Sequence, residues 1–398
     1  PPLASSSSSS SSSFSSLTNR DESLTGTSTT TTTAAEPFSQ ATTENSLVHT
    51  LLLCRHGDSI WNGGEPGSRE TFTGWTNVPL SQKGIREAQE TGRQVSEFEL
   101  GIDACFTSIL QRAQLTAHYC LWGFAEKPNT QSPRRYIQDY RLNERHYGAL
   151  QGLVKEDVEK GLYGHDPDLV QQWRRSWHTV PPLLDDDDPR RLDEIKAYAN
   201  FCGGPERVPK GESLQQVAEF RILPFLQERL CPVLQQAATS RQQSTQTATT
   251  GTINPSPLMT PGGTGLVVAH ANSLRALIGV ICNVQQDALA LKKLEALRLQ
   301  TGVPLVLRFR QDLNSHPEMV QFQPCDIDGI PFLQGSSSSS SSSSRGLVPE
   351  LPVYPLSSIP MKSIQPNTPT TTFLSTSTPT SSIRDYNNTA SFIRTVPF

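Results

Sequence analysis

Three tracts of low-complexity sequence limit how much of this chain can fold. Serine and threonine runs dominate residues 1–46, a serine run and a Pro/Thr/Ser-rich stretch occupy 335–398, and Gln, Thr, Gly and Pro fill 237–264. Segments this poor in apolar side chains bury too little surface to offset the entropy lost on ordering. We therefore expect disordered extensions at 1–46 and 335–398, a polar surface loop at 237–264, and one folded domain over 47–325.

The chain of 398 residues carries a formal net charge of −4, which is nearly neutral for its length. A surface that binds nucleic acid or anionic lipid needs an excess of basic side chains, which this sequence lacks. Its apolar runs are also shorter than the roughly 20 residues that cross a bilayer. The sequence therefore predicts no nucleic-acid partner and no membrane partner.

The seven cysteines are scattered, and no two form a Cys-x-x-Cys pair. Zinc sites need clustered thiols and imidazoles, so we predict no bound metal. Isolated cysteines within apolar runs, such as Cys54, are typical of buried reduced thiols, which favours a cytoplasmic location. The acid-poor N-terminal stretch leaves an organellar transit peptide as the alternative, although Arg20 is its only basic residue before His49.

Strands and helices alternate along the expected domain. Val48–Cys54 is an almost continuous apolar run, as expected of a strand buried on both faces. Ser81 is a suitable N-cap for the helical pattern that follows it. Further strands are predicted at 104–107, 266–269 and 303–309, and further helices at 110–122 and 274–281. This alternation predicts an α/β fold, a three-layer α/β/α domain with a mainly parallel central sheet.

Basic side chains follow three of these predicted strands. Arg55-His56-Gly57 ends the first, Arg112 follows the second, and His270 follows the third. The carboxyl ends of parallel strands meet at one edge of a sheet, where ligands bind. Because the guanidinium fork matches phosphate oxygens, we expect a phosphorylated ligand there. A neutral imidazole held by a carbonyl at one nitrogen can attack phosphorus with the other, so His56 is the candidate nucleophile.

Longer motifs around these residues resemble the histidine phosphatase superfamily, in the form used by phosphoglycerate mutases. The Arg-His-Gly triplet alone is short enough to recur by chance, so the specificity comes from the motifs that continue and follow it in the family's order. They are Leu53-Cys54-Arg55-His56-Gly57-Asp58-Ser59-Ile60-Trp61-Asn62, Phe72-Thr73-Gly74-Trp75, Leu142-Asn143-Glu144-Arg145-His146-Tyr147-Gly148, Trp173-Arg174-Arg175-Ser176, Ala269-His270-Ala271-Asn272-Ser273-Leu274-Arg275 and Thr301-Gly302-Val303-Pro304-Leu305. The resemblance covers residues 48–310, apart from the 237–264 tract.

The resemblance implies a role for each matching residue. The catalytic set would be the nucleophile His56, the general acid/base Glu144, and the phosphoryl-binding residues Arg55, Arg112 and His270. Substrate binding would fall to Asn62, Ser59, Thr73, Gly74, Tyr147, Lys155, Arg174, Arg175 and Asn272. Glu212-Ser213-Leu214 also matches the family, and we expect it only to begin a helix.

The activity implied is the interconversion of 3-phosphoglycerate and 2-phosphoglycerate in glycolysis and gluconeogenesis, primed by 2,3-bisphosphoglycerate and independent of metal. The partner would be a small phosphorylated three-carbon acid, and the assembly a homodimer or a homotetramer. A phosphatase or a bisphosphoglycerate synthase on the same fold is the first alternative, because water that reaches the phosphohistidine turns a mutase into a phosphatase. The second is a non-catalytic scaffold that uses its tails for interactions, which predicts the loss of catalytic residues that this chain retains.

Two positions depart from the family pattern. Ala271 stands where glycine usually follows the second histidine, and its methyl group would interfere if that position needed a positive φ or close contact with phosphate. The segment Gly63–Thr71 is longer than the usual spacer between Asn62 and Phe72, which would alter a lid or an oligomer contact.

Overall fold

A computed structural model describes residues 46–97, 101–125, 133, 135–248, 260–313, 322–325 and 354–355. The chain divides into two units, residues 1–42 and 43–398, and all of the described residues lie in the second. Of the predicted extensions at 1–46 and 335–398, only Ser46 and Tyr354–Pro355 are described, and the rest lie outside the described residues. None of the described helices is long and apolar enough to cross a bilayer.

The described strands form one sheet. Their bounds are β1 Ser46–Arg55, β2 Ala104–Thr107, β3 Arg135–Gln138, β4 Thr260–Ala269, β5 Leu305–Asp312, β6 Phe322–Cys325 and β7 Tyr354–Pro355. The order across the sheet is β3-β2-β4-β1-β5-β6, and β7 also pairs with β5. Strands β3, β2, β4 and β1 are parallel, whereas β5 is antiparallel to β1, β6 and β7. The α/β fold is therefore confirmed, and the sheet is mixed: its parallel strands β3, β2, β4 and β1 lie side by side, and every antiparallel pair involves β5.

The direction of β5 follows from where the chain re-enters the sheet. Thr301 pairs with Arg55 at the carboxyl end of β1, so the strand that starts at Leu305 must run back along β1. The apolar pattern of 303–309 could not predict this reversal, because the spacing of buried residues reports which face is covered and not which way the strand runs.

The helices occupy the connections between these strands. The α-helices are α1 Gln82–Glu97, α2 Gln111–Ala125, α3 Lys155–Glu159, α4 Pro167–Arg175, α5 Pro189–Cys202, α6 Leu214–Gln216, α7 Leu223–Phe225, α8 Cys231–Ala248, α9 Ala271–Ile281 and α10 Ala288–Ala296. Wider π-type turns, Val217–Ile222 and Leu226–Leu230, join α6, α7 and α8 into one helical segment. Pro224 and Pro232 lie in this segment, and a proline has no N–H for the regular hydrogen-bond ladder. Single turns of 3₁₀ helix lie at Tyr140–Leu142, Gly148–Leu150, Pro205–Arg207 and Val284–Gln286.

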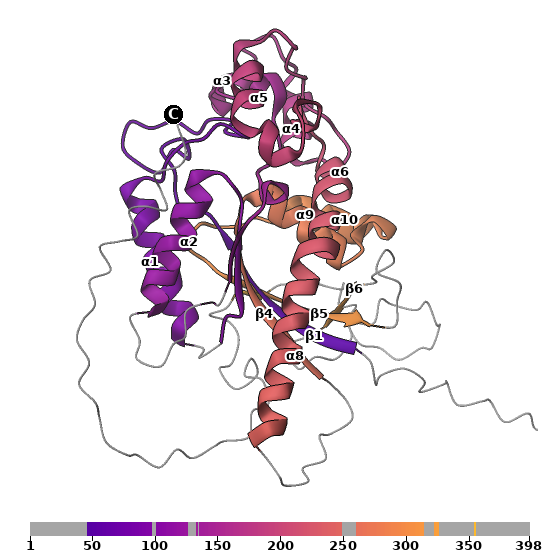
Figure 1. The fold of residues 1–398 in the computed structure, drawn as a ribbon. Helices are drawn as coiled ribbons and strands as arrows, with labels where there is room; N and C mark the ends of the chain where they lie inside the picture. Colours follow the sequence, from indigo (N-terminus) through magenta and orange to yellow (C-terminus); the bar gives the residue numbers. More distant parts are fainter. Residues whose placement is uncertain are drawn as a thin grey trace, which may run out of the picture. The chain divides into compact units, whose positions relative to one another are not determined.

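Alternate residues of β1 pack against opposite helical layers. Leu51 and Leu53 belong to a core cluster with α9 and the 214–234 segment, whereas Leu52 and Cys54 belong to a cluster with α1 and α2. Figure 1 shows α1 and α2 on one side of the sheet, with α8 and α9 on the other. All four side chains are buried, which confirms the strand that was expected to be covered on both faces.

The 237–264 tract is more regular than the surface loop that its composition predicts. Helix α8 continues into it as far as Ala248 and β4 begins at Thr260, while residues 249–259 lie outside the described ones. Ala238 is buried, and a Cβ placed on Gly263 would come within 2.6 Å of Leu234 O. Polar composition conceals such an element, because a helix needs only one buried stripe and a glycine allows the strand to approach it closely.

Candidate active site

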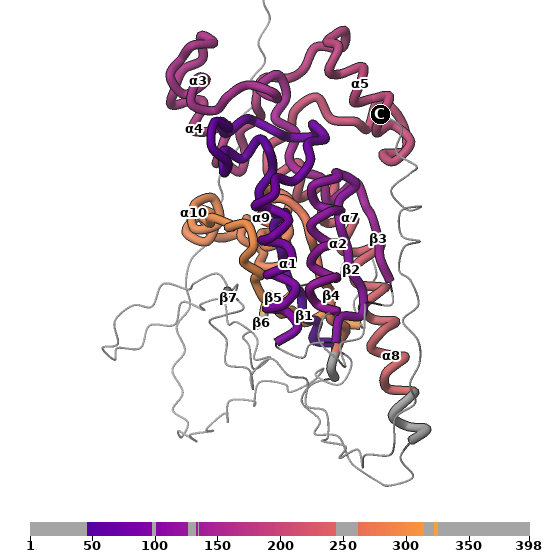
Figure 2. The backbone as a smooth tube through the Cα atoms, turned by 90° about the vertical axis from the view of Figure 1, so that its left-hand side faces the viewer, coloured from indigo at the N-terminus to yellow at the C-terminus, as the bar shows by residue number. Residues whose placement is uncertain are grey.

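His56 and His270 follow neighbouring parallel strands at the same end of the sheet. Strands β1 and β4 stay in register up to Arg55 and Ala269, and the His56 N–H donates to Ala269 O at 2.9 Å. The two imidazole centroids lie 4.9 Å apart. Figure 2 shows α3, α4 and α5 beyond this end of the sheet. The chain thus places two histidines against each other beneath a cap of helices.

A backbone carbonyl fixes the ring of His56. Nδ1 lies 2.8 Å from Gly57 O, and because a carbonyl can only accept, Nδ1 is the donor and Nε2 keeps its lone pair. The Gly57 N–H donates to Thr116 Oγ1 at 2.9 Å. A Cβ at Gly57 would come within 2.4 Å of Gly84 O on α1. Only glycine fits this contact, so the loop that carries His56 packs directly on the helix behind it.

Burial and two guanidinium groups keep both histidines neutral. Desolvation lowers the pKa of His56 well below its usual value, and the charges of Arg112 and Arg55 lower it further. The pKa of His270 is lowered by burial, by Arg112 and by His56. His270 Nε2 lies 2.8 Å from Ser108 Oγ, while its buried Nδ1 has no hydrogen-bond partner among the described residues. The neutral imidazole is the nucleophilic form of histidine.

Backbone carbonyls orient the two arginines. Arg112 donates from one terminal nitrogen to Thr76 O at 2.9 Å and from the other to Gly74 O at 2.8 Å. Burial lowers the pKa of Arg112 to about 10, which still leaves it charged at neutral pH. Arg55 donates to Leu299 O at 2.9 Å. In both side chains the buried Nε has no partner in the described part of the chain, so each keeps a donor for an anion.

Glu144 is held by the segment that carries it and by the start of α9. Its Oε1 accepts from the Arg145 N–H at 2.8 Å and from the Asn272 N–H at 3.2 Å. Its peptide carbonyl accepts from Trp75 Nε1 at 2.7 Å. The residue is buried, and both its side chain and its backbone are therefore fixed before any ligand arrives.

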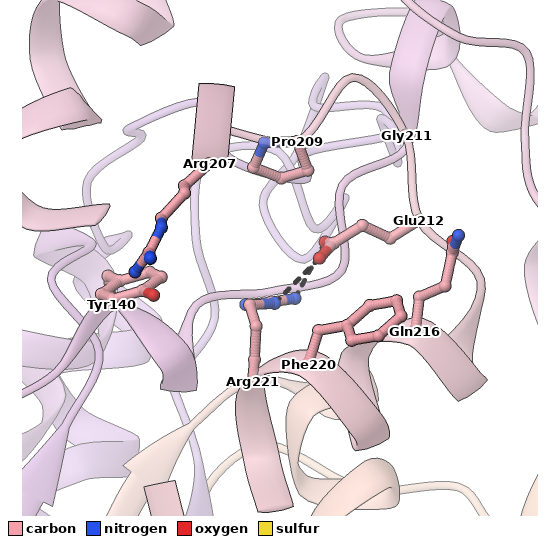
Figure 3. A pocket seen from close by; sticks show the side chains of 8 residues that line it. All are labelled: Tyr140, Arg207, Pro209, Gly211, Glu212, Gln216, Phe220 and Arg221. Atoms are coloured by element: carbon pink, nitrogen blue, oxygen red, sulfur yellow. Dashed lines mark hydrogen bonds and ion pairs between the residues drawn. The ribbon is translucent and has the colours of Figure 1, made fainter. Parts of the chain in front are cut away.

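A buried ion pair supports the Glu144 segment from behind. Arg221 donates to Glu212 Oε2 at 2.9 Å and to Asn143 O at 2.8 Å, and Glu212 Oε2 also accepts from the His146 N–H at 2.8 Å. Figure 3 shows this pair in the wall of a cavity of about 360 Å³. The rest of the cavity is lined by Tyr140, Arg207, Pro209, Gly211, Gln216 and Phe220, so it is separate from the histidines. The predicted helix start is present, with Ser213 capping α6, but Glu212 also anchors this segment.

Tyr147, Asn272 and Arg275 form a hydrogen-bonded row beside Glu144. Asn272 Nδ2 donates to the Tyr147 hydroxyl at 2.9 Å, and Arg275 donates to Asn272 Oδ1 at 2.9 Å. Burial lowers the pKa of Arg275 to about 10, with the nearby charge of Arg175 as the next cause. The sequence motifs gave Arg275 no role. Its spacing of three residues from Asn272 on a helix was the signal that could have identified it.

Carboxylates pair with two of the three predicted substrate-binding cations. Lys155 Nζ lies 2.5 Å from Glu70 Oε1, and Arg174 pairs with Glu159. Arg175 is half-buried, and its pKa is lowered by burial and by Arg174. An anion that bound to Lys155 or Arg174 would therefore compete with these carboxylates.

The remaining predicted residues bond within their own loops. Asn62 Oδ1 accepts from the Ser59 N–H at 2.9 Å and from Ser59 Oγ at 2.5 Å, and Thr73 Oγ1 donates to Thr71 O at 3.2 Å. No hydrogen bond joins Asn62, Ser59 or Thr73 to His56 in the described structure. The long segment Gly63–Thr71 is tied to α3, because Arg69 pairs with Asp157 at 2.6 Å.

Among the described residues, no group of three or more His, Cys, Asp and Glu side chains could hold a metal ion. The six cysteines whose side chains are described are buried, as their sequence context predicts.

Comparisons with known proteins found a matching family model and similar curated proteins. Residues 51–187 match the model of the histidine phosphatase superfamily (branch 1). The 2,3-bisphosphoglycerate-dependent phosphoglycerate mutase 1 of Lactobacillus johnsonii is 36% identical over 267 residues, which are 66% of this chain and 95% of that protein. The corresponding mutase of Lactobacillus acidophilus is 35% identical, covering 66% of this chain and 95% of that protein. The 2,3-bisphosphoglycerate-dependent phosphoglycerate mutase 2 of Lactiplantibacillus plantarum is 37% identical, covering 66% of this chain and 94% of that protein.

Proposed function

The chain belongs to the 2,3-bisphosphoglycerate-dependent phosphoglycerate mutases of the histidine phosphatase superfamily, and from this membership we propose that it interconverts 3-phosphoglycerate and 2-phosphoglycerate through a phosphohistidine at His56. We assign this reaction to glycolysis and gluconeogenesis. The geometry of His56 is the observation that carries the proposal, because a neutral ring with Nδ1 fixed as donor leaves Nε2 to attack phosphorus.

The residues around His56 fit a doubly phosphorylated acid. Three guanidinium groups, those of the buried Arg112 and Arg275 and of the half-buried Arg55, lie around the histidines and Glu144. Two of them, Arg55 and Arg112, keep an unpartnered Nε among the described residues. The positive charges of such a site attract a polyanion, and burying them without one would lower the free energy of unfolding. When bound, 2,3-bisphosphoglycerate supplies the phosphoryl group that primes the enzyme.

The residues of the chain then have defined tasks in each transfer. The substrate hydroxyl attacks the phosphoryl group on His56, the N–P bond breaks, and its electron pair returns to Nε2. Glu144 accepts the proton of that hydroxyl, and it returns the proton to the departing oxygen when the other phosphoryl group moves back to His56. Arg55 and Arg112 stabilise charge on the non-bridging oxygens.

Burial favours a mutase over a phosphatase. His56 is 4% exposed, Arg112 1% and His270 0%, so the ring of His56 has little contact with water in this structure. Exclusion of water protects a reactive intermediate from hydrolysis. Tyr147, Asn272, Lys155, Arg174 and Arg175 would hold the carboxylate and the second phosphate while the intermediate turns.

The test is a coupled assay of 2-phosphoglycerate formation from 3-phosphoglycerate, run with and without trace 2,3-bisphosphoglycerate and with excess EDTA. We expect turnover that depends on the primer and is unaffected by EDTA. His56→Asn should abolish turnover and labelling by ³²P-bisphosphoglycerate, whereas His118→Asn, at an exposed imidazole on α2, should retain both.

Three outcomes would count against the proposal. Turnover that needs no primer and vanishes in EDTA would exclude this mechanism. Full turnover by His56→Asn would exclude the nucleophile. Release of inorganic phosphate faster than formation of 2-phosphoglycerate would identify a phosphatase, and net formation of 2,3-bisphosphoglycerate a synthase.

The assembly and the location stay predictions. We propose a homodimer or a homotetramer in the cytoplasm, which sedimentation velocity of the purified chain and imaging of a tagged chain would test.

A further inference from the structure

Glu194 is a buried carboxylate on α5 that accepts two side-chain hydrogen bonds. Its Oε2 lies 2.8 Å from His146 Nε2, and its Oε1 accepts from Gln151 Nε2 at 2.7 Å. The residue is 8% exposed, while its neighbour Asp193 is exposed. A buried carboxylate is costly unless donors satisfy it, so this placement needs a reason.

The bonding on both sides of Glu194 allows only one arrangement of donors and acceptors. The Gly148 N–H donates to His146 Nδ1 at 2.9 Å, so the ring proton lies on Nε2 and points to Glu194. The Trp75 N–H donates to Gln151 Oε1 at 2.8 Å, so the amide nitrogen of Gln151 also points to Glu194. The carboxylate is the acceptor that both donors require.

These hydrogen bonds form a closed circuit that connects the segment of Glu144 and His146 with the segment of Trp75. His146, Glu194, Gln151 and Trp75 form its sides, and Trp75 Nε1 donates to Glu144 O at 2.7 Å. Glu144 is joined to His146 through the backbone. The carbonyl oxygen of Gly74, the residue before Trp75, accepts a hydrogen bond from Arg112 at 2.8 Å. The circuit therefore links the segment of the proposed general acid/base to the segment that orients a phosphoryl-binding arginine.

We propose that Glu194 is a positioning residue, which touches no substrate and holds Glu144 and Arg112 at their working separation through His146, Gln151 and Trp75. This inference rests on the proposed mutase function. It predicts that changes at Glu194 act on catalysis more than on substrate capture, because Arg174 and Arg175 lie on α4, outside the circuit.

An exchange of amide and carboxylate tests the circuit without changing its shape. Glu194→Gln turns an amide N–H₂ toward one of two N–H donors, so one bond is lost. Gln151→Glu places two carboxylates against each other. The double variant Glu194→Gln with Gln151→Glu restores every bond. In it, the amide at position 194 accepts from His146 and donates to the carboxylate at position 151, which still accepts from the Trp75 N–H.

We expect each single variant to lower kcat by about 10- to 100-fold, the loss that misplacement of catalytic groups by an ångström produces. The KM for 3-phosphoglycerate should change by less than about twofold, since ground-state binding is untouched. The double variant should recover most of the lost kcat. Arg191→Lys is the matched control, because Arg191 is a buried residue of α5 that bonds to Pro205 O and Pro209 O. It should lower the melting temperature and leave kcat unchanged.

Two results would overturn the inference: Glu194→Gln with the kcat of the unaltered enzyme, or a double variant no more active than either single one. Absence of turnover in the unaltered chain would instead refute the proposed function. In that case ¹⁵N spectra of histidine-labelled protein still test the circuit. The His146 ring should carry its proton on Nε2 in the unaltered chain and in the double variant, and the Nδ1 tautomer in either would refute the circuit itself.

Discussion

The imidazole rings of His56 and His270 lie 4.9 Å apart and are inclined by 57°. Arg112 lowers the pKa of both rings, and His56 itself lowers that of His270. Two imidazolium rings at this distance, beside a guanidinium, would repel one another strongly. In the absence of a bound anion, both imidazole rings are therefore expected to be neutral.

This relationship predicts how the pair titrates. In the ligand-free enzyme both rings should stay neutral well below pH 6.5, because burial and Arg112 lower each pKa from its unfolded value. The measurement is an NMR titration of labelled histidines, assigned with His56→Asn and His270→Asn. A midpoint near 6.5 for either ring would contradict the electrostatic picture of the site.

Gly74 should not tolerate a side chain. Its φ is +50°, and an added Cβ would come within 1.8 Å of Gln151 Oε1. We expect Gly74→Ala to destabilise the fold by about 1–3 kcal/mol and to lower kcat, since Gln151 and the carbonyl that holds Arg112 must shift. Gly67→Ala is the control, because Gly67 has a φ of +80° but open space around it. Equal losses of stability and activity in both variants would show that backbone conformation alone matters.

Arg175 should act on substrate binding. It is half-buried beside Arg174, and burial together with that charge lowers its pKa. Arg175→Ala should raise the KM for 3-phosphoglycerate by about 10- to 100-fold, the worth of a charged hydrogen bond, with a smaller change in kcat. Arg93→Ala, at an exposed arginine on α1, should leave both constants unchanged. A loss confined to kcat would place Arg175 in the chemical step.

His49 should make the fold sensitive to acid. Its Nε2 lies 2.9 Å from Gln311 Oε1, its Nδ1 accepts from the Gly263 N–H at 2.9 Å, and burial lowers its pKa from 6.5 to about 4. Between pH 6.5 and about 4, unfolding is therefore accompanied by uptake of a proton at His49. The stabilisation is complete above pH 6.5 and is lost as pH falls toward 4, by up to about 3 kcal/mol.

Urea unfolding at several pH values measures this contribution. The difference in unfolding free energy between the unaltered chain and His49→Asn should shrink steadily as the pH falls from 6.5 toward 4. A difference that is constant with pH would show that His49 does not titrate on unfolding.

Ala271 should be harmless to catalysis. It is the first residue of α9, and Asn283 is the one non-glycine residue with a positive φ in the described part of the chain. The backbone at Ala271 therefore needs no glycine. Ala271→Gly should lower stability by up to about 1 kcal/mol without raising kcat/KM. A several-fold gain in kcat/KM would show that the methyl group obstructs the phosphoryl group.

The sequence predicted the elements of this fold better than their directions. A short apolar run bounded by polar residues, such as that of β1, indicates a strand buried on both faces, and Ser81 caps α1 as expected. The direction of β5 is determined by the path of the chain between Ile281 and Leu305, and no local sequence pattern indicates that path. Composition likewise concealed the extent of α8 within the 237–264 tract.

The site was predictable where its residues follow strands or belong to long motifs. His56, Arg112 and His270 met the first condition, and Glu144 met the second. Glu194 met neither, because it stands among charged residues of α5 and shares its buried face with Arg191 and Tyr198. Hydrophobic periodicity cannot identify a face that is buried by polar side chains.

The register of β1 has a further consequence for how such a chain can change over generations. Leu47 pairs with Thr260, whereas Arg55 pairs with Ala269, so two low-complexity tracts enter the sheet at the end opposite to His56. A change in the length of either tract before Leu47 or before Thr260 therefore leaves the number of residues from there to His56 and His270 unchanged, so the spacing of the two histidines does not depend on the length of these tracts.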